Sequence, residues 1–296
     1  MPEAPVRRPC IIDTDPGLDD FLAIRMALRA SELDVQCLTA TGGNCSLELA
    51  VTNALRCVED SGHADLPVHA GASEGLFGPF FDASIIHGDT GLPVELPPPQ
   101  RTATDGHAVP AMAARLSPAA AMTTVISLGP LTNLAWLLRD HPESAERIEQ
   151  VVVMGGAVDV PGNITPHAEF NIWNDPVAAS IVVASGLPVR LVGLDACRHV
   201  VLEREDASQL SGMAGLLLQA WFDSDSSRNQ FTMHDPLTVL AAIDPRLFTF
   251  ERTPISVLES GEEQGRTQRG GDGPENEVAT GVDADAARKL CMSLLM

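Results

Sequence analysis

The sequence predicts an α/β protein with a doubly wound, mainly parallel sheet and helices on both of its faces. Short apolar runs alternate with segments of helical period, the pattern of strands joined by crossover helices. The 296 residues are 45% hydrophobic, enough for one large core. A cluster of carboxylates directly follows the first apolar run, at the edge of the sheet where open α/β folds bind ligands. No linker divides the chain, so we expect a single domain over residues 1–296.

The expected elements follow from the period of the apolar positions. The predicted strands cover residues 10–12, 35–41, 68–70, 123–127, 151–154 and 189–194. The predicted helices cover residues 21–30, 47–58, 110–116, 131–139 and 176–185. Three segments are irregular. Residues 71–105 are typical of an active-site loop, residues 155–175 link a strand to a helix and are dense in Asn and acid, and residues 259–283 suit a surface hairpin or a mobile loop.

The charge balance excludes several classes of partner. The formal net charge is −21, whereas a nucleic-acid backbone or an anionic membrane needs clustered Lys and Arg. Lys289 is the only lysine, which excludes mechanisms that need a lysine earlier in the chain. Six cysteines without a CxxC pair indicate reduced, buried thiols, and no apolar run suits a secretion signal or a membrane span. We therefore expect a cytoplasmic protein that binds neither nucleic acid nor membranes.

The most informative motif is Asp13-Thr14-Asp15-Pro16-Gly17-Leu18-Asp19-Asp20. Its four carboxylates raise one another's pKa unless a cation lies between them, and the nearest arginines are Arg8 and Arg25. A hard divalent cation held by oxygen ligands solves this problem. A simpler alternative is that Asp15 caps a helix with Pro16 at its first position, but capping accounts for one of the four acids.

A phosphatase of the haloacid-dehalogenase type is a second alternative for this motif. That chemistry uses an Asp-x-Asp pair after a strand, a Thr or Val two positions later, and a downstream Lys. Gly17 occupies the position of the Thr or Val, and Lys289 lies near the end of the chain. Both departures argue against a phosphatase.

Further polar residues follow other predicted strands and would meet the acids at the same edge of the sheet. Asn44 follows a Gly pair after the second strand, and it can bind a polyhydroxylated ligand. Gly129 and Pro130 leave the carbonyl of Leu128 accessible to a hard cation. The loop before residue 175 contains a row of hydrogen-bonding groups suited to sugar hydroxyls, although turn formation and capping account for them equally well: Asn163, Glu169 and Asn171.

His234 and Asp235 stand together at the start of a further predicted helix. Asp235 either caps this helix or completes a metal site. His234 is a candidate proton donor, since imidazole titrates near neutral pH.

Together these segments resemble the nucleoside hydrolase family, the inosine-uridine preferring nucleoside N-ribohydrolases. The resemblance rests on the Asp-x-Asp-Pro-Gly-x-Asp-Asp motif and continues to about residue 240. The further matching segments are Asn44, His87-Gly88, Gly129-Pro130-Leu131-Thr132-Asn133, Met154-Gly155-Gly156, Ala168-Glu169-Phe170-Asn171 and His234-Asp235-Pro236-Leu237.

The resemblance implies a nucleoside hydrolase-like fold and a site with one Ca²⁺. The ion would be bound by Asp15, Asp20, Asp235 and the carbonyl of Leu128, and Asp15 would also be the general base. His234 would protonate or orient the leaving base. Ribose would be held by Asp19, Asn44, Met154, Asn163, Glu169 and Asn171, with His87 near the base. Asp13 is expected to accept hydrogen bonds that fix the loop.

The predicted function is Ca²⁺-dependent hydrolysis of the N-glycosidic bond of ribonucleosides, which releases ribose and a free purine or pyrimidine base. The resemblance also implies nucleoside salvage and a homodimer or homotetramer. Two alternatives stay open: a hydrolase of another N-ribosyl compound, and a non-catalytic homologue that binds Ca²⁺ or ribose. Residues 221–231 indicate no base preference, because Trp221 and Phe222 suit base stacking and the core equally.

Overall fold

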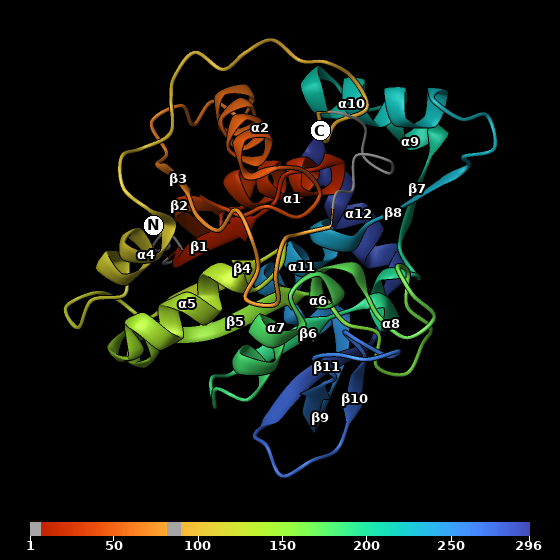
Figure 1. Ribbon diagram of the computed structural model, residues 1–296. Coiled ribbons are helices and arrows are strands. Elements are labelled where there is room, and N and C mark those ends of the chain that lie inside the picture. Colours follow the sequence, from red (N-terminus) through yellow and green to blue (C-terminus); the bar gives the residue numbers. More distant parts are fainter. Residues whose placement is uncertain (1–6, 82–89) are drawn as a thin grey trace, which may run out of the picture.

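One large sheet takes strands from both ends of the chain. The computed structural model describes residues 7–81 and 90–296, and its strand order is β10-β9-β11-β6-β5-β4-β1-β2-β3 (Figure 1). The strands from β3 across to β11 run parallel, whereas β9 pairs antiparallel with β11 on one side and with β10 on the other. The strands are β1 (Arg8–Thr14), β2 (Leu33–Ala40), β3 (Val68–Ala70), β4 (Thr123–Ser127), β5 (Ile148–Met154), β6 (Val189–Val192), β9 (Phe248–Val257), β10 (Thr267–Arg269) and β11 (Glu275–Val282), with β7 (Val201–Glu203) and β8 (Gln230–Thr232) paired separately.

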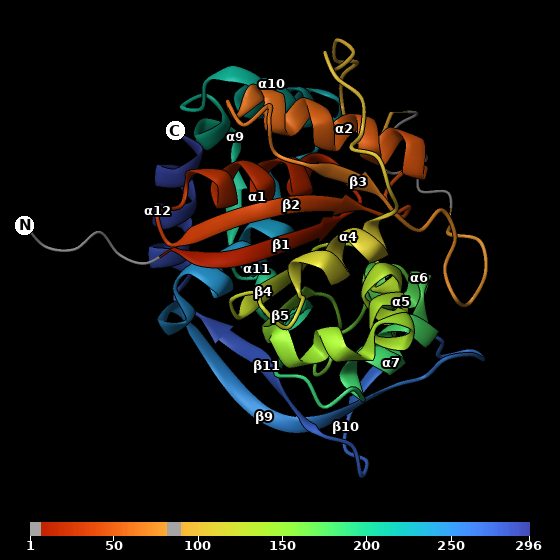
Figure 2. The same cartoon turned by 90° about the vertical axis from the view of Figure 1, so that its left-hand side faces the viewer.

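Helices cover both faces of this sheet, which confirms the predicted fold class. Figure 2 shows α1 and α2 on one side of β1 and β2, and α4 on the other. The first face carries α1 (Leu18–Arg29), α2 (Leu47–Asp60), α10 (Gly212–Asp223), α11 (His234–Ile243) and α12 (Ala284–Leu295), and the second carries α4 (Ala108–Arg115), α5 (Thr132–Asp140) and α7 (Pro176–Val183). The short helices are α6 (Phe170–Asn174), α8 (Leu194–Cys197), α9 (Arg204–Ala207) and the 3₁₀ turns η1 (Pro142–Arg147) and η2 (Pro245–Leu247).

Strand β1 shows why a near-continuous apolar run is needed here. Its side chains alternate between the faces, so Cys10 and Ile12 join one core cluster with Phe21 of α1, while Ile11 joins a second cluster with Met112 of α4. All five side chains are fully buried. A parallel strand covered on both sides has no polar face, and this is the pattern read from the sequence.

All the predicted elements are present, and the bounds of most of them differ from the predicted ones by about one to three residues. Residues 68–70 and 123–127 form strands with the expected bounds. The first helix begins at Leu18, earlier than expected, because Gly17 is its N-cap and the Asp20 carboxylate accepts the Gly17 N–H at 3.0 Å. Asp15 and Pro16 lie ahead of this cap, so the capping alternative for Asp15 is wrong. The strand expected over residues 189–194 ends at Val192, and α8 follows.

Residues 259–283 belong to the extension of the sheet beyond β6 and include β10 and all of β11. β10 forms a hairpin with the preceding β9, whereas β11 lies inside the sheet between β9 and β6, so the hairpin expectation holds only for the first part of this segment. Arg190 of β6 anchors the extension, because its guanidinium donates to Glu277 of β11 at 2.7 and 3.0 Å and lies 4.3 Å from the ring centre of Phe250 in β9. The ion pair is mostly buried, so its two partners depend on one another.

All six cysteines are free thiols, as expected, and five of them are buried. Burial raises the pKa of the Cys10 thiol to about 12, so this group is unreactive near neutral pH. Among the helices of the described residues, none is long and apolar enough to cross a membrane.

The strand order creates a switch point between β1 and β4. From β1 the chain adds β2 and β3 on one side, and from β4 it adds β5 and β6 on the other. Crossover helices leave in opposite directions there, which opens a crevice at the carboxyl ends of the strands. The acidic motif follows β1 and Leu128 follows β4, so the sheet topology brings both to this crevice.

Asp175 is expected to be a major contributor to stability. This fully buried N-cap of α7 accepts hydrogen bonds from Thr132 Oγ1 (2.6 Å), Leu76 N (2.7 Å) and Ala178 N (3.1 Å). Asp175→Ala leaves these buried donors unpaired and should lower the free energy of unfolding by about 3 kcal/mol, measured by urea denaturation. Asp140→Ala removes an exposed acid and is the matched control. A loss below about 1 kcal/mol in Asp175→Ala would contradict this assignment.

Candidate active site

A cavity of about 280 Å³ lies at the switch point. Its walls come from the ends of β4 and β5, the starts of α1, α6 and α11, and the loops after β2 and β5. The lining residues are Asp19, Asn44, Leu128, Met154, Asn163, Ile164, Glu169, Phe170, Asn171, His234 and Asp235. Nine of these eleven were predicted from the sequence, and Ile164 and Phe170 were not.

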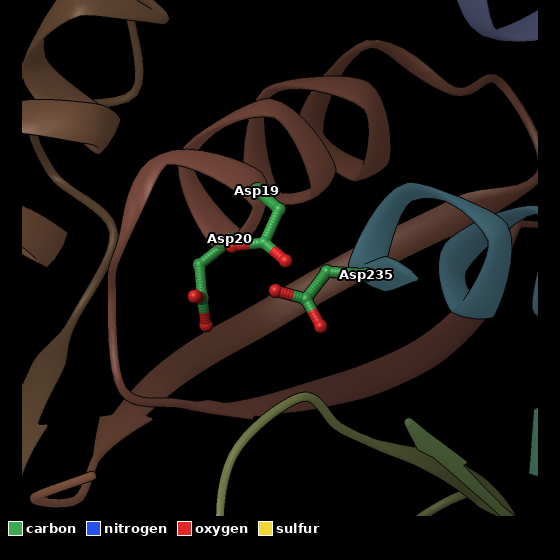
Figure 3. Close-up of side chains that lie close together, drawn as sticks. All are labelled: Asp19, Asp20 and Asp235. Atoms are coloured by element: carbon green, nitrogen blue, oxygen red, sulfur yellow. The ribbon is translucent and has the colours of Figure 1, made fainter. Parts of the chain in front are cut away.

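Three carboxylates meet beside this cavity from two helix starts. Figure 3 shows Asp19 and Asp20 on α1 facing Asp235 on α11. One oxygen of each lies within 4.8 Å of the others. Because α1 begins at Leu18 and α11 at His234, all three acids fall in a first helical turn, where free N–H groups and the helix dipole favour negative charge. The N-cap of α11 is Met233, so the alternative that Asp235 caps this helix is wrong.

Asp20 is held by donors from three segments. Its Oδ1 accepts from Thr14 Oγ1 at 2.5 Å, and its Oδ2 accepts from Gly17 N at 3.0 Å and from Asn44 Nδ2 at 3.1 Å. Asn44 is thereby oriented by the acid cluster. Thr14 was missed in the sequence, although a threonine between two candidate ligands is a natural donor to them.

Asp15 is fully buried and belongs neither to the described lining of the cavity nor to the group of three close carboxylates, but it contacts the lining residue Asn44. Its Oδ2 accepts from Asn44 N at 2.7 Å, while its Oδ1 has no hydrogen-bond partner among the described residues. Two glycines make room for this carboxylate. A Cβ at Gly43 would lie 2.0 Å from Oδ2, and a Cβ at Gly129 would lie 2.6 Å from Oδ1. The Gly-containing turns after β2 and β4 are therefore required by the size of the Asp15 carboxylate.

The ionised carboxylates of Asp15, Asp20 and Asp235 repel one another. Burial raises the pKa values of Asp15, Asp20 and Asp235, and the nearby carboxylates raise them further. Neither Lys nor Arg is among the described residues that line the cavity. An all-oxygen donor set, a buried carboxylate oxygen without a partner and uncompensated negative charge together fit a hard divalent cation.

The side chains of Glu169 and Asn171 form hydrogen bonds with the backbone and also line the cavity. The Glu169 carboxylate caps α6 by accepting from Asn171 N (2.9 Å) and Ile172 N (3.2 Å), and it also accepts from Gly156 N (3.2 Å). Burial raises its pKa. Asn171 donates to the carbonyl of Leu128 at 2.6 Å and to that of Met154 at 3.2 Å. The capping alternative is thus correct for Glu169, and its carboxylate still lines the cavity.

The loop between β5 and α6 is fixed by two further acceptors, the exposed Asn163 and the buried Asp195. Asn163 Oδ1 accepts from Phe170 N at 2.9 Å. Asp195, at the start of α8, accepts from Val158 N (2.9 Å) and Asp159 N (2.8 Å). Asp195 was missed, although an acid directly after a buried strand is the signal that identified Asp13 and Asp15.

Three further sequence predictions have mixed outcomes. Asp13 accepts from Thr39 Oγ1 (2.6 Å) and Asn133 Nδ2 (2.8 Å), as expected of a residue that fixes the loop, and burial raises its pKa to about 6. Phe222 is a fully buried core residue, whereas Trp221 lines a second chamber next to the cavity. His87 lies outside the described residues.

Comparison with known proteins links this arrangement to one family. Residues 10–289 match the family described as inosine-uridine preferring nucleoside hydrolase. The chain is 35% identical to a probable uridine nucleosidase 2 of Arabidopsis thaliana over 98% of both chains. It is 37% identical to the pyrimidine-specific ribonucleoside hydrolase RihA of Shewanella woodyi, over 88% of this chain and 87% of the relative.

Solved structures of similar proteins have the same fold. A plant nucleoside hydrolase, PpNRh1, superposes with a TM-score of 0.91 at 32% identity, over 97% of this chain and 98% of the other. A purine-preferring ribonucleoside hydrolase from Gardnerella vaginalis superposes with a TM-score of 0.90 at 32% identity, over the same shares of the two chains.

Substitution of Gly43 tests whether a cation is bound beside Asp15. Gly43→Ala forces a methyl group onto Asp15 Oδ2 and should weaken Ca²⁺ binding about tenfold to a hundredfold, measured by calorimetric titration. Gly273→Ala is the matched control, because no atom lies within 4 Å of the added Cβ there. Equal Ca²⁺ affinity in the two variants, with equal thermal stability, would contradict a cation site at Asp15.

Proposed function

Because this chain belongs to the inosine-uridine preferring nucleoside hydrolase family, we propose that it is a Ca²⁺-dependent member. As a nucleoside N-ribohydrolase it cleaves ribonucleosides at the bond between ribose and base. One observation carries the calcium assignment: the carboxylates of Asp19, Asp20 and Asp235 meet with no Lys or Arg among the described residues that line the cavity, and the charge of the nearby buried Asp15, whose Oδ1 has no partner among the described residues, adds to theirs.

The cation would be held by Asp15, Asp20, Asp235 and the carbonyl of Leu128. When bound, it would lower the pKa of a coordinated water and bind the ribose diol. The Leu128 carbonyl accepts one hydrogen bond from Asn171 and retains a second lone pair for a ligand. Asp19 belongs to the same acid cluster, but it also lines the cavity 3.7 Å from His234 Nδ1, and we assign it to ribose.

Asp15 is the proposed general base. The hydrogen bond from Asn44 N fixes one carboxylate oxygen, and the other accepts no hydrogen bond from the part of the chain that the structure describes. Asp15 Oδ1 would accept a proton from the attacking water as the new C–O bond forms.

The remaining polar residues of the cavity are proposed to bind ribose. Their carboxylate and amide groups match hydroxyl donors and acceptors, and their negative charge stabilises a ribosyl group that becomes positive as the N-glycosidic bond breaks. Glu169 contributes charge while its remaining lone pair accepts from a hydroxyl. The proposed ribose-binding residues are Asp19, Asn44, Met154, Asn163, Glu169 and Asn171.

His234 is proposed to protonate or orient the leaving base. It begins α11, is partly exposed and stands where the cavity meets the second chamber. His87 is proposed to lie near the base. We further propose that the enzyme acts in cytoplasmic nucleoside salvage as a homodimer or homotetramer.

A nucleoside panel with controlled metal tests this function. After chelation and dialysis into phosphate-free buffer, the protein should release reducing sugar from nucleosides in the presence of Ca²⁺. Without Ca²⁺ the rate should fall about a hundredfold or more, and Mg²⁺ should restore little because it demands a smaller octahedral site. Activity confined to nicotinamide riboside would favour another N-ribosyl substrate. Ligand binding without sugar release from any ribosyl compound would favour a non-catalytic homologue.

Substitution of His234 tests the role of a leaving-group acid. His234→Ala should slow hydrolysis of natural nucleosides about 10²- to 10⁴-fold, the contribution of a general acid, and should slow nitrophenyl riboside far less because nitrophenolate needs no proton. Steady-state rates on both substrates give the comparison, with the exposed His199→Ala as the control variant. Equal losses on both substrates would show that His234 does not act as the acid.

A further inference from the structure

A second chamber adjoins the cavity that contains the acid cluster. Its volume is about 500 Å³, against about 280 Å³ for the first cavity. Asp19 and His234 line both spaces, so they form the boundary between them. The chemistry changes across this boundary, because Trp221, Phe231 and Arg228 replace the acids and amides of the first cavity.

Arg228 is held in a defined place on the wall of this chamber. Its guanidinium carbon lies 4.6 Å from the ring centre of Trp221. Its Nη1 donates to the carbonyl of Trp221 at 3.1 Å and to Ser224 Oγ at 2.7 Å. Within the described residues, the side-chain hydrogen bonds of Arg228 all use Nη1, so the N–H groups at Nε and Nη2 are available to a ligand.

The aromatic residues fix this arrangement. Trp221 makes edge-to-face contacts with Phe222 at 5.1 Å and with Phe231 at 5.0 Å. The guanidinium lies over the tryptophan ring as a cation–π partner. Trp221 therefore positions Arg228 and is a support for the cation. Because the arginine is ordered before a ligand binds, little side-chain entropy is lost on binding.

We propose that Arg228 selects the nucleobase by donating hydrogen bonds to a ring carbonyl. This inference rests on the proposed function, in which ribose occupies the first cavity and His234 stands at the scissile bond. Arginine has donors and no acceptor. The carbonyl oxygens O4 of uracil and O6 of a 6-oxopurine accept from it, whereas the amino groups of cytosine and adenine at the same positions are donors and face it unfavourably.

The other polar groups of the chamber do not impose this choice. Gln230 and Thr232 each present both a donor and an acceptor, so they suit a carbonyl or an amino group. Asp225, in the turn before Arg228, accepts hydrogen bonds from Ser227 N (2.8 Å) and Ser227 Oγ (2.7 Å). Asp19 accepts only, but it stands at the boundary of the chamber and is assigned to ribose, so Arg228 is the donor-only side chain through which the described chamber wall distinguishes oxo bases from amino bases.

The kcat/KM values for paired nucleosides test this proposal. In the wild type, uridine should exceed cytidine and inosine should exceed adenosine, because each pair differs by one carbonyl-to-amino exchange. Arg228→Gln replaces a donor-only group by an amide that also accepts, and both ratios should fall about tenfold or more, the effect of a lost charge-assisted hydrogen bond. Arg228→Lys keeps a cation and should give intermediate ratios, including where Arg228→Gln does not fold.

Arg204→Gln is the matched control. Arg204 lies 5.3 Å from the ring centre of Phe222 and donates to the carbonyl of Phe222, but it does not line the chamber, so both ratios should stay at the wild-type values. Unchanged ratios in the Arg228 variants, or equal losses on all four nucleosides, would overturn the proposal while leaving the hydrolase function intact. A wild type that hydrolyses none of the four would overturn both.

Discussion

The burial of several carboxylates in one place is the constraint on which the rest of the site depends. Asp15, Asp20 and Asp235 are removed from water although each repels the others, a costly arrangement without compensation. The fold supplies partial compensation through Thr14, Gly17 and Asn44, and through the starts of two helices. These donors orient the acids but leave their charge unneutralised. On the proposed assignment a divalent cation would complete the balance, and the same negative field suits a substrate whose sugar becomes positive.

Much of the fold follows from local sequence patterns, because buried parallel strands and crossover helices leave strong periodic signals. The sequence shows the glycines, but not what they contact. The N–H of Gly17 donates to Asp20, and the missing Cβ of Gly43 leaves room for Asp15, which comes from another segment. The strand order depends on long-range pairing, which the period does not contain. The convergence of Asp235 with Asp20 came from a family resemblance, since no spacing rule joins residues so far apart.

The loop between β5 and α6 shows why capping and ligand binding were hard to separate in the sequence. Both functions require Asn, Asp or Glu near a helix start. Glu169 accepts three backbone N–H groups and still lines the cavity, because a carboxylate has about four acceptor sites. Its structural bonds fix its position, and its remaining capacity faces the ligand. The two interpretations therefore describe one side chain, and a choice between them was unnecessary.

The opposite charges of the two chambers bear on the proposed reaction. As an N-glycosidic bond breaks, positive charge develops on the sugar and negative charge on the departing base. The first cavity presents carboxylates, and the second presents the guanidinium of Arg228, with Asp19 and His234 at their boundary. Fixed charges of the correct sign on each side stabilise this separation more than they stabilise the neutral nucleoside. On the proposed assignment, Arg228 therefore favours an oxo base in two ways. Arg228 donates a hydrogen bond to the carbonyl of the base in the ground state, and it stabilises the part of the negative charge that develops on this carbonyl as the base leaves.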